Sequence, residues 1–216
     1  MKRSRANYFA DNLDRLSRRD RVFLNNPVVM QGLGIAPIVI PAINIQNAAI
    51  LAVAVLLLLT PTRMLATFIG QHTGFKFRAV IYALTSGLVF VAVAWVLEAM
   101  FGNALTAVGI YLPLLVFEPL ILKRYESPKR ERVITSLRKG LLTTLGFCLV
   151  LFFSAGLREL LAAGTLGGVA VFRGGLLPIA ALPTGGFIML GLIAAVWRGI
   201  VNAFKKSVEA EVKDAT

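Results

Sequence analysis

Three polar side chains within or beside apolar stretches could carry an ion through a membrane. They are Glu118, Gln31 and Asn44, and Glu118 is the ionisable one. A carboxylate inside hydrocarbon is costly to bury, and such residues commonly mark ion or proton pathways. The sequence therefore predicts an ion path that includes these three residues. It shows no nucleophile–base pair, nucleotide loop or set of metal ligands, so we expect no catalytic residue and no metal site in the chain.

A second interpretation of Glu118 stays open on the sequence alone. Lys123 and Arg124 follow Glu118 by about one and a half helical turns. A carboxylate close to the membrane surface could pair with either of them and serve only to hold the end of a helix. The depth of Glu118 decides between an ion path and a surface ion pair.

Two apolar segments interrupted by glycine and proline must position these polar residues. One covers residues 31–41 and the other covers residues 109–119, and each opens one half of the chain. Interruptions free backbone N–H and C=O groups, which inside a membrane must be satisfied by protein or face a cavity. Helix breaks at corresponding places in two halves point to a binding site near the middle of the bilayer.

Composition identifies the chain as an α-helical membrane protein. Hydrophobic residues make up 57% of it, charged residues 16%, and the mean hydropathy is +0.75. A span needs about 20 apolar residues. We expect six transmembrane helices in two inverted three-helix repeats, with the first and fourth helices broken. The four continuous spans are predicted at 47–69, 79–97, 140–157 and 176–197, and the two broken ones at 27–43 and 105–122.

Basic residues predict the orientation. Of the 23 Lys and Arg residues, all except Arg158 and Arg173 fall on one side of a six-span arrangement. By the positive-inside rule, both termini are cytoplasmic and the protein is a multi-pass protein of the plasma or inner membrane. The net charge of +12 then reflects topology and attraction to anionic lipid rather than nucleic acid. We expect a basic interfacial segment at 1–26, a membrane domain at 27–200 with repeats near 27–99 and 101–200, and a cytoplasmic tail at 201–216.

Two features near the predicted outer face are expected to be structural. Arg158 and Glu159 stand at the end of a span, where we expect them to anchor it at the membrane surface. The glycine-rich stretch at 164–175 lacks the preceding strand and the basic ending of a phosphate-binding loop, so we expect a flexible turn there.

Four short stretches resemble the Rnf/Nqr family of integral membrane subunits, nearest to its RnfE/NqrD branch. The resemblance covers about residues 25–197 and is carried by Asn25-Asn26-Pro27 with Gln31, by Gly32-Leu33-Gly34-Ile35, by the segment 109–116, and by Leu157-Arg158-Glu159-Leu160 with Gly164-Thr165-Leu166. It implies a subunit of an ion-translocating electron transport complex, paired with a related six-span subunit. Electrons would cross the membrane and drive Na⁺ or H⁺ movement.

The resemblance also implies a cofactor, and here the chain departs from the family pattern. Two related subunits of the family together hold one [2Fe–2S] cluster through a Cys in each broken helix. Those positions are Ala36 and Pro119 in this chain, and Lys123-Arg124 replaces a Gly-Arg pair. Alanine and proline cannot ligate iron, which needs thiolates or, in some centres, His. Cys148, the single cysteine, lies in another span, so we expect no cofactor bound by this chain alone.

Two functions follow from these observations. The first is a membrane subunit of an Rnf/Nqr-like ion-translocating electron transport complex, without its own cluster ligands. The second is a divergent paralogue that acts as a small-solute or ion transporter, or as a membrane scaffold, without a redox role. In neither case is the chain itself expected to be a catalytic enzyme.

Overall fold

The computed structural model of this chain describes residues 20–73, 77–119, 121 and 132–213. Four of its helices are long and apolar enough to cross a membrane. They are α4 (Ile45–Gln71), α5 (Arg78–Phe101), α8 (Val133–Ala163) and α9 (Pro183–Lys213). The sequence-based assignment to an α-helical membrane protein is confirmed at this level, with each helix longer than its predicted span.

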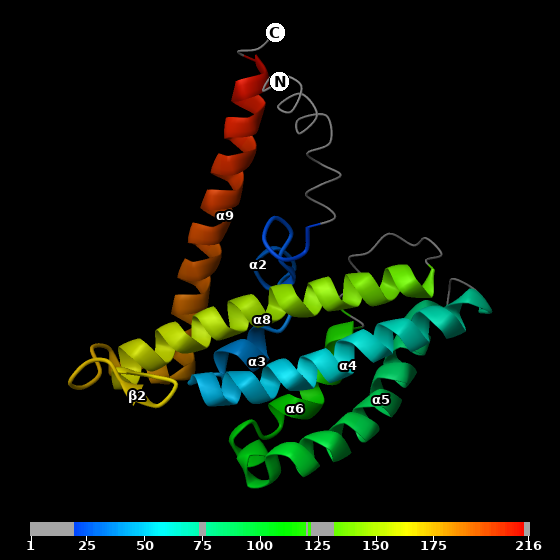
Figure 1. Cartoon of the computed structure of the whole chain (residues 1–216), viewed down its shortest axis with the longest axis horizontal. Coiled ribbons are helices and arrows are strands. Elements are labelled where there is room, and N and C mark those ends of the chain that lie inside the picture. The colour runs from blue at the N-terminus through cyan, green and yellow to red at the C-terminus, as the bar shows by residue number, and fades with distance from the viewer. Residues whose placement is uncertain (1–19, 74–76, 120, 122–131, 214–216) are drawn as a thin grey trace.

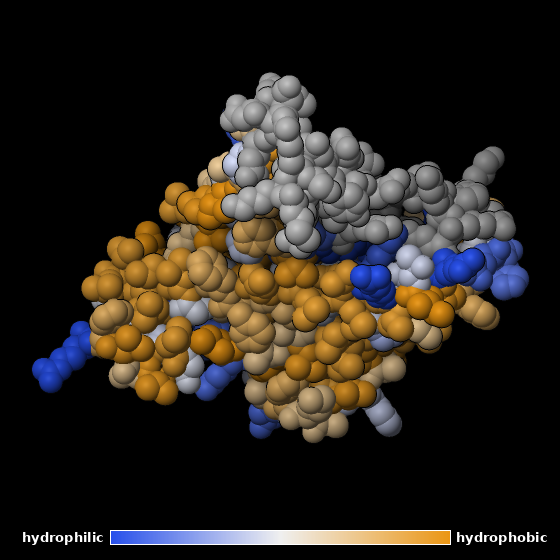
Figure 2. All heavy atoms as spheres, turned by 45° about the horizontal axis from the view of Figure 1, so that its top comes forward, coloured by the Kyte–Doolittle hydropathy of each residue, from blue (hydrophilic) through white to orange (hydrophobic). Residues whose placement is uncertain are grey.

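The long helices form a layer around α4. Helix α4 packs along α8 on one side and along α5 on the other. Helix α9 crosses the end of α8 and rises away from this layer (Figure 1), and most of its membrane-length window is exposed. Apolar side chains cover much of the surface in Figure 2, with hydrophilic ones gathered at the end where α4 ends and α8 begins.

Both predicted interruptions are present as short helical pieces. The first segment contains α2 (Pro27–Gln31) and α3 (Ile35–Val39), and the second contains η2 (Gly102–Ala107), α6 (Tyr111–Leu114) and η3 (Leu115–Phe117). Helix α2 ends at Gly32 in the left-handed conformation, with Gly32 and Leu33 donating N–H bonds back to Val28 and Pro27. This arrangement satisfies two carbonyls at the end of the helix.

The glycine-rich stretch is a hairpin followed by a turn of helix. Strands β1 (Thr165–Leu166) and β2 (Val169–Ala170) pair antiparallel. Gly167 and Gly168 connect them with φ values of 60° and 83°, the positive angles that a tight two-residue turn requires. The stretch is therefore not the open phosphate loop that its composition resembles, which agrees with the expectation of a turn.

The predicted start of the last span was wrong. We expected it at residue 176, whereas η4 (Pro178–Ala181) comes first and α9 begins at Pro183. Each proline lacks an N–H and has a fixed φ, so each fits the first turn of a helix and disrupts an interior position. Helix α9 then continues past the predicted end at 197 and reaches Lys213.

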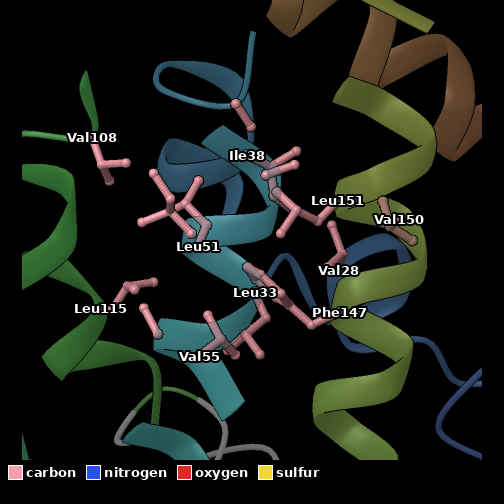
Figure 3. Packing of buried hydrophobic residues seen from close by; sticks show 14 of the residues in the cluster. Val28, Leu33, Ile38, Leu51, Val55, Val108, Leu115, Phe147, Val150 and Leu151 are labelled. Atoms are coloured by element: carbon pink, nitrogen blue, oxygen red, sulfur yellow. The ribbon is translucent and has the colours of Figure 1, made fainter. Parts of the chain in front are cut away.

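The first broken segment lies inside the molecule rather than at its edge. Figure 3 shows side chains from this segment, among them Leu33 and Ile38, packed between Leu51 of α4 and Phe147 of α8. Within a bilayer such packing stabilises through close contact more than through removal of apolar surface from water. The short helices are thus held in place by the long ones on both sides.

Replacement of Gly34 should test this close packing. A Cβ on Gly34 would stand 2.0 Å from Cε2 of Phe147, and its φ is 67°, so Gly34→Ala should destabilise the fold by about 1–3 kcal/mol. The thermal unfolding midpoint of the purified protein in detergent measures the effect. Gly87→Ala in α5 is the matched control, because no atom lies within 4 Å of the new methyl group. Equal midpoints for the two variants would contradict the packing described here.

Candidate functional site

The two broken segments meet through Glu118. Its Oε2 accepts a hydrogen bond of 3.0 Å from the backbone N–H of Gly34, 84 residues away in the sequence. Glu118 is 8% exposed, and Gly34 precedes the first residue of α3. Gly34 provides no side-chain cap, so the carboxylate from the second segment satisfies a backbone donor of the first. Lys123 and Arg124, the alternative partners, lie outside the described residues.

A small cavity adjoins the Glu118 carboxyl group. Its volume is about 10 Å³, and apart from Glu118 it is lined by Val55, Leu58, Leu59, Leu115 and Pro119. A space of this size holds about one water molecule. Glu118 is therefore a carboxyl group with a backbone donor on one side and apolar walls on the other.

Arg158 satisfies the carbonyl groups at the far end of the first segment. It is fully buried, and its guanidinium donates to the carbonyls of Ile38, Val39 and Ala42, which close α3 and the turn after it. The same group donates to the carbonyls of Ala180, Ala181 and Leu182, which precede α9. Five fixed N–H donors make Arg suited to this task. Arg158 therefore joins two segments inside the protein instead of anchoring a span end at the surface.

Glu159 binds backbone and side-chain donors on the opposite side of the same turn. Its Oε2 accepts from the N–H of Ile45 at 2.9 Å, at the start of α4. Its Oε1 accepts from Thr165 Oγ1 at 3.0 Å and from the N–H of Gly168 at 2.9 Å. A carboxylate at a helix start and a guanidinium at a helix end each match the local backbone charge. Adjacent residues of α8 thus hold the α3–α4 turn and the hairpin.

Three further residues hold the broken segments. Asn26 is fully buried, accepts from the N–H groups of Val28 and Val29, and donates to the carbonyls of Val22 and Gly146. Arg198 donates to the carbonyl of Val29 from Nε at 3.0 Å and Nη2 at 2.7 Å. Ser86 of α5 donates to the carbonyl of Val116 at 2.6 Å. The Asn-Pro sequence could have identified Asn26 as a helix cap; no comparable signal marks Ser86 or the target of Arg198.

Gln31 and Asn44 lie elsewhere on the first segment. Gln31 ends α2, with Nε2 3.5 Å from Asn25 Oδ1 and its buried Oε1 without a hydrogen-bond partner. Asn44 caps α4 by accepting from the N–H of Asn47 at 2.8 Å. Together with Gln46 and Glu159 it lines a pocket of about 390 Å³. No hydrogen bond among the described residues joins Gln31, Asn44 and Glu118.

These features define a class: an α-helical membrane protein whose first apolar segment is broken in the core, with its free backbone groups bound by buried side chains. Comparison with known proteins places the chain more narrowly. The family description "Rnf-Nqr subunit, membrane protein" matches residues 17–194, and the chain belongs to this family.

Individual relatives are all named as subunits of an ion-translocating oxidoreductase complex. One such protein, from Pseudomonas paraeruginosa, is 32% identical over 91% of this chain and 89% of its own length. Proteins with the same name from Shewanella frigidimarina and Shewanella oneidensis are 31% and 29% identical, over 86% and 80% of this chain and 89% and 81% of their own lengths.

The residues at the family's cluster positions do not fit a [2Fe–2S] cluster. Ala36 lies half-buried on α3 and Pro119 lies buried beside Glu118, and neither side chain has an atom that can bind iron. Glu118, the nearest candidate ligand, already accepts from Gly34. Among the described residues, no group of three or more His, Cys, Asp and Glu side chains could hold a metal ion.

Removal of the Arg158 donors should destabilise the broken segment. Arg158→Met keeps the length of the side chain but leaves buried carbonyls such as that of Ala180 unsatisfied. Each such group costs about 1–3 kcal/mol, so we expect a total loss of about 3 kcal/mol or more. Heating in detergent followed by size-exclusion chromatography measures the folded fraction. Arg173→Met, at an exposed position of the loop after β2, should change stability by less than about 0.5 kcal/mol, and equal losses would refute the role of Arg158.

Proposed function

We propose that this chain is a membrane subunit of an Rnf/Nqr-like ion-translocating electron transport complex and provides no ligands for a [2Fe–2S] cluster. Membership of the Rnf-Nqr family over residues 17–194 carries the proposal. Relatives that cover most of the chain are named as subunits of such a complex. Ala36 and Pro119 remove the cluster ligands while the broken segments around them remain.

The proposed membrane arrangement has six spans in two inverted repeats, near residues 27–99 and 101–200. The two broken segments support it, because Gly34 and Gly109 both adopt positive φ (67° and 53°) shortly before the short helices α3 and α6. The distribution of basic residues places both termini on the cytoplasmic side of the cell membrane. Helix α9 has 31 residues, about 46 Å, so its end around the predicted tail at 201–216 extends beyond a core of about 30 Å.

The proposed partners are the other membrane subunits of the complex, including a related six-span subunit. Six roughly parallel spans require α9 to run beside α4 and α8, whereas α9 leans away from them here (Figure 1). Its apolar side chains, among them Phe187, Leu192 and Val196, are exposed. Such a helix needs lipid or protein around it, and a partner subunit would supply part of that contact.

Glu118 is the proposed ion-carrying residue of the chain. It is a buried carboxyl group at the junction of two broken segments, where a titratable side chain is retained against a considerable energetic cost. Gln31 and Asn44 remain candidates for the path on either side of it. Arg158, Glu159 and Asn26 hold the surrounding backbone and do not themselves carry the ion.

Isolation of the native complex tests the first part of the proposal. A tag on this chain should co-purify a related six-span subunit together with flavin and iron–sulfur subunits. Cys148→Ala removes the only thiol of the chain and should leave the iron content and the electron paramagnetic resonance spectrum unchanged, because iron held by thiolates then belongs to other subunits. Purification of the chain without redox subunits, or loss of an iron–sulfur signal in Cys148→Ala, would contradict the proposal.

Glu118→Gln tests the ion-carrying role in vesicles that contain the complex. With an electron donor present, the variant should build a much smaller ion gradient than the parent, because the amide cannot take up or release a proton. Glu98→Gln, at an exposed position near the end of α5, is the matched control and should behave as the parent. A full gradient in Glu118→Gln would exclude Glu118 from the path.

A second function is a transporter or scaffold without a redox role. The loss of both cluster positions, at Ala36 and Pro119, favours it. Purified chain in liposomes would then move a small solute or ion without an electron donor, and Glu118→Gln would reduce that flux. Under the first function, the chain alone shows no such flux.

A further inference from the structure

Buried hydroxyl groups gather in one half of the helical layer. Of the eight buried Ser and Thr side chains among the described residues, seven lie where α4 ends and where α5 and α8 begin, and the exception is Ser154; the seven are Thr60, Thr62, Thr85, Ser86, Ser136, Thr143 and Thr144. The buried residues of α4 in the other half are apolar, among them Ala48, Leu51 and Val55. Polar atoms in a membrane protein are costly, so this one-sided distribution calls for a reason.

Several of these hydroxyl groups touch one another at the hydrophilic end of the layer. Thr67 Oγ1 lies 2.8 Å from Ser136 Oγ and 3.4 Å from Tyr82 Oη. Thr60 Oγ1 lies 3.5 Å from Thr144 Oγ1. A hydroxyl group both donates and accepts, so each contact can pass a proton in either direction. The polar half of α4 is therefore linked to both α5 and α8.

The buried face of α5 extends this line toward Glu118. Thr85 and Ser86 follow Tyr82 after one helical turn and are buried on the same face. Ser86 donates to the carbonyl of Val116 in η3, two residues before Glu118. The hydroxyl groups of α5 thus run from the end of the layer to the second broken segment.

Thr62 supplies a buried hydroxyl group from α4. It lies one turn beyond Val55, Leu58 and Leu59, which line the cavity beside Glu118, so it shares their face of the helix. Thr62 is 0% exposed and its Oγ1 has no hydrogen-bond partner. An unsatisfied buried hydroxyl costs about 1–3 kcal/mol. A bound water or a transient proton carrier next to Thr62 would account for its retention.

We propose that Ser136, Thr67, Tyr82, Thr85, Ser86 and Thr62 form a proton path, the hydroxyl lane, from the end of the layer near residues 72–77 to Glu118. The lane ends there, because the buried side chains of α4 beyond Glu118 are apolar. Glu118 therefore exchanges protons with that one side, which the basic residues assign to the cytoplasm. The inference rests on the proposed ion-carrying role of Glu118 and adds the ion and the side of access.

The size of the space beside Glu118 favours a proton over a metal cation. The cavity of about 10 Å³ accommodates about one water molecule, which is too little for a cation with its hydration shell. A proton passes along hydroxyl groups and single waters without moving any heavy atom far. Gaps of one helical turn between Tyr82, Thr85 and Ser86 are short enough for bridging waters.

Infrared spectroscopy of the full chain in lipid nanodiscs tests the lane. The carboxyl C=O band that disappears in Glu118→Gln belongs to Glu118, and its shift after transfer to D₂O gives the proton exchange rate. Thr62→Val and Tyr82→Phe remove one hydroxyl each and keep the side-chain shape. We expect each to slow exchange about tenfold or more, because the loss of one relay hydrogen bond raises the barrier by about 1–1.5 kcal/mol.

Ser154→Ala is the matched control, because Ser154 is a buried hydroxyl of α8 outside the lane and its Oγ has no hydrogen-bond partner. It should exchange like the parent, and Thr62→Ser, which keeps the hydroxyl, should restore the parent rate. Unchanged exchange in both Thr62→Val and Tyr82→Phe would overturn the lane. So would equal slowing in Ser154→Ala, or the absence of any Glu118 carboxyl band down to low pH. The measurement uses no electron donor, so its failure leaves membership of the complex untouched.

Discussion

The need to satisfy backbone groups away from water governs this structure. A continuous helix satisfies its own N–H and C=O groups, but α2 and α3 are short and leave most of theirs free. In the core of a membrane protein each such group costs several kcal/mol unless something binds it. The side chains around the first broken segment can all be understood as answers to this one requirement.

Each end of α2 and α3 has its own solution. Asn26 binds the start of α2, and Arg198 binds the carbonyl of Val29 near its end. Glu118 binds the start of α3, and Arg158 binds its end. Acidic or amide oxygens meet free N–H groups and arginines meet free carbonyls, as the local backbone charges require. Four different parts of the chain thus fix one interrupted segment, and Glu118 is the one among them that can lose its charge by protonation.

The sequence predicted what depends on local composition and missed what depends on long-range contacts. Long apolar runs, proline and glycine were enough to locate the four continuous helices and both interruptions. The start of α9 was misplaced because residues 176–182 are as apolar as a span, and only the prolines at 178 and 183 mark the boundary. Arg158 looked like a surface anchor, since its carbonyl partners are up to 120 residues away. Nothing in the local pattern indicates which backbone a buried arginine will bind.

The substitutions at Ala36 and Pro119 change how the two broken segments are held together. A shared cluster would require thiolates from a second subunit, so the grip would depend on the partner and on iron. The bond from Gly34 to Glu118 lies within one chain and needs neither. A carboxylate also differs from a thiolate–iron bond because a proton can weaken it directly, since the protonated oxygen is a poorer acceptor. The chain has therefore exchanged an electron-carrying junction for one that responds to protons, at the same place in the fold.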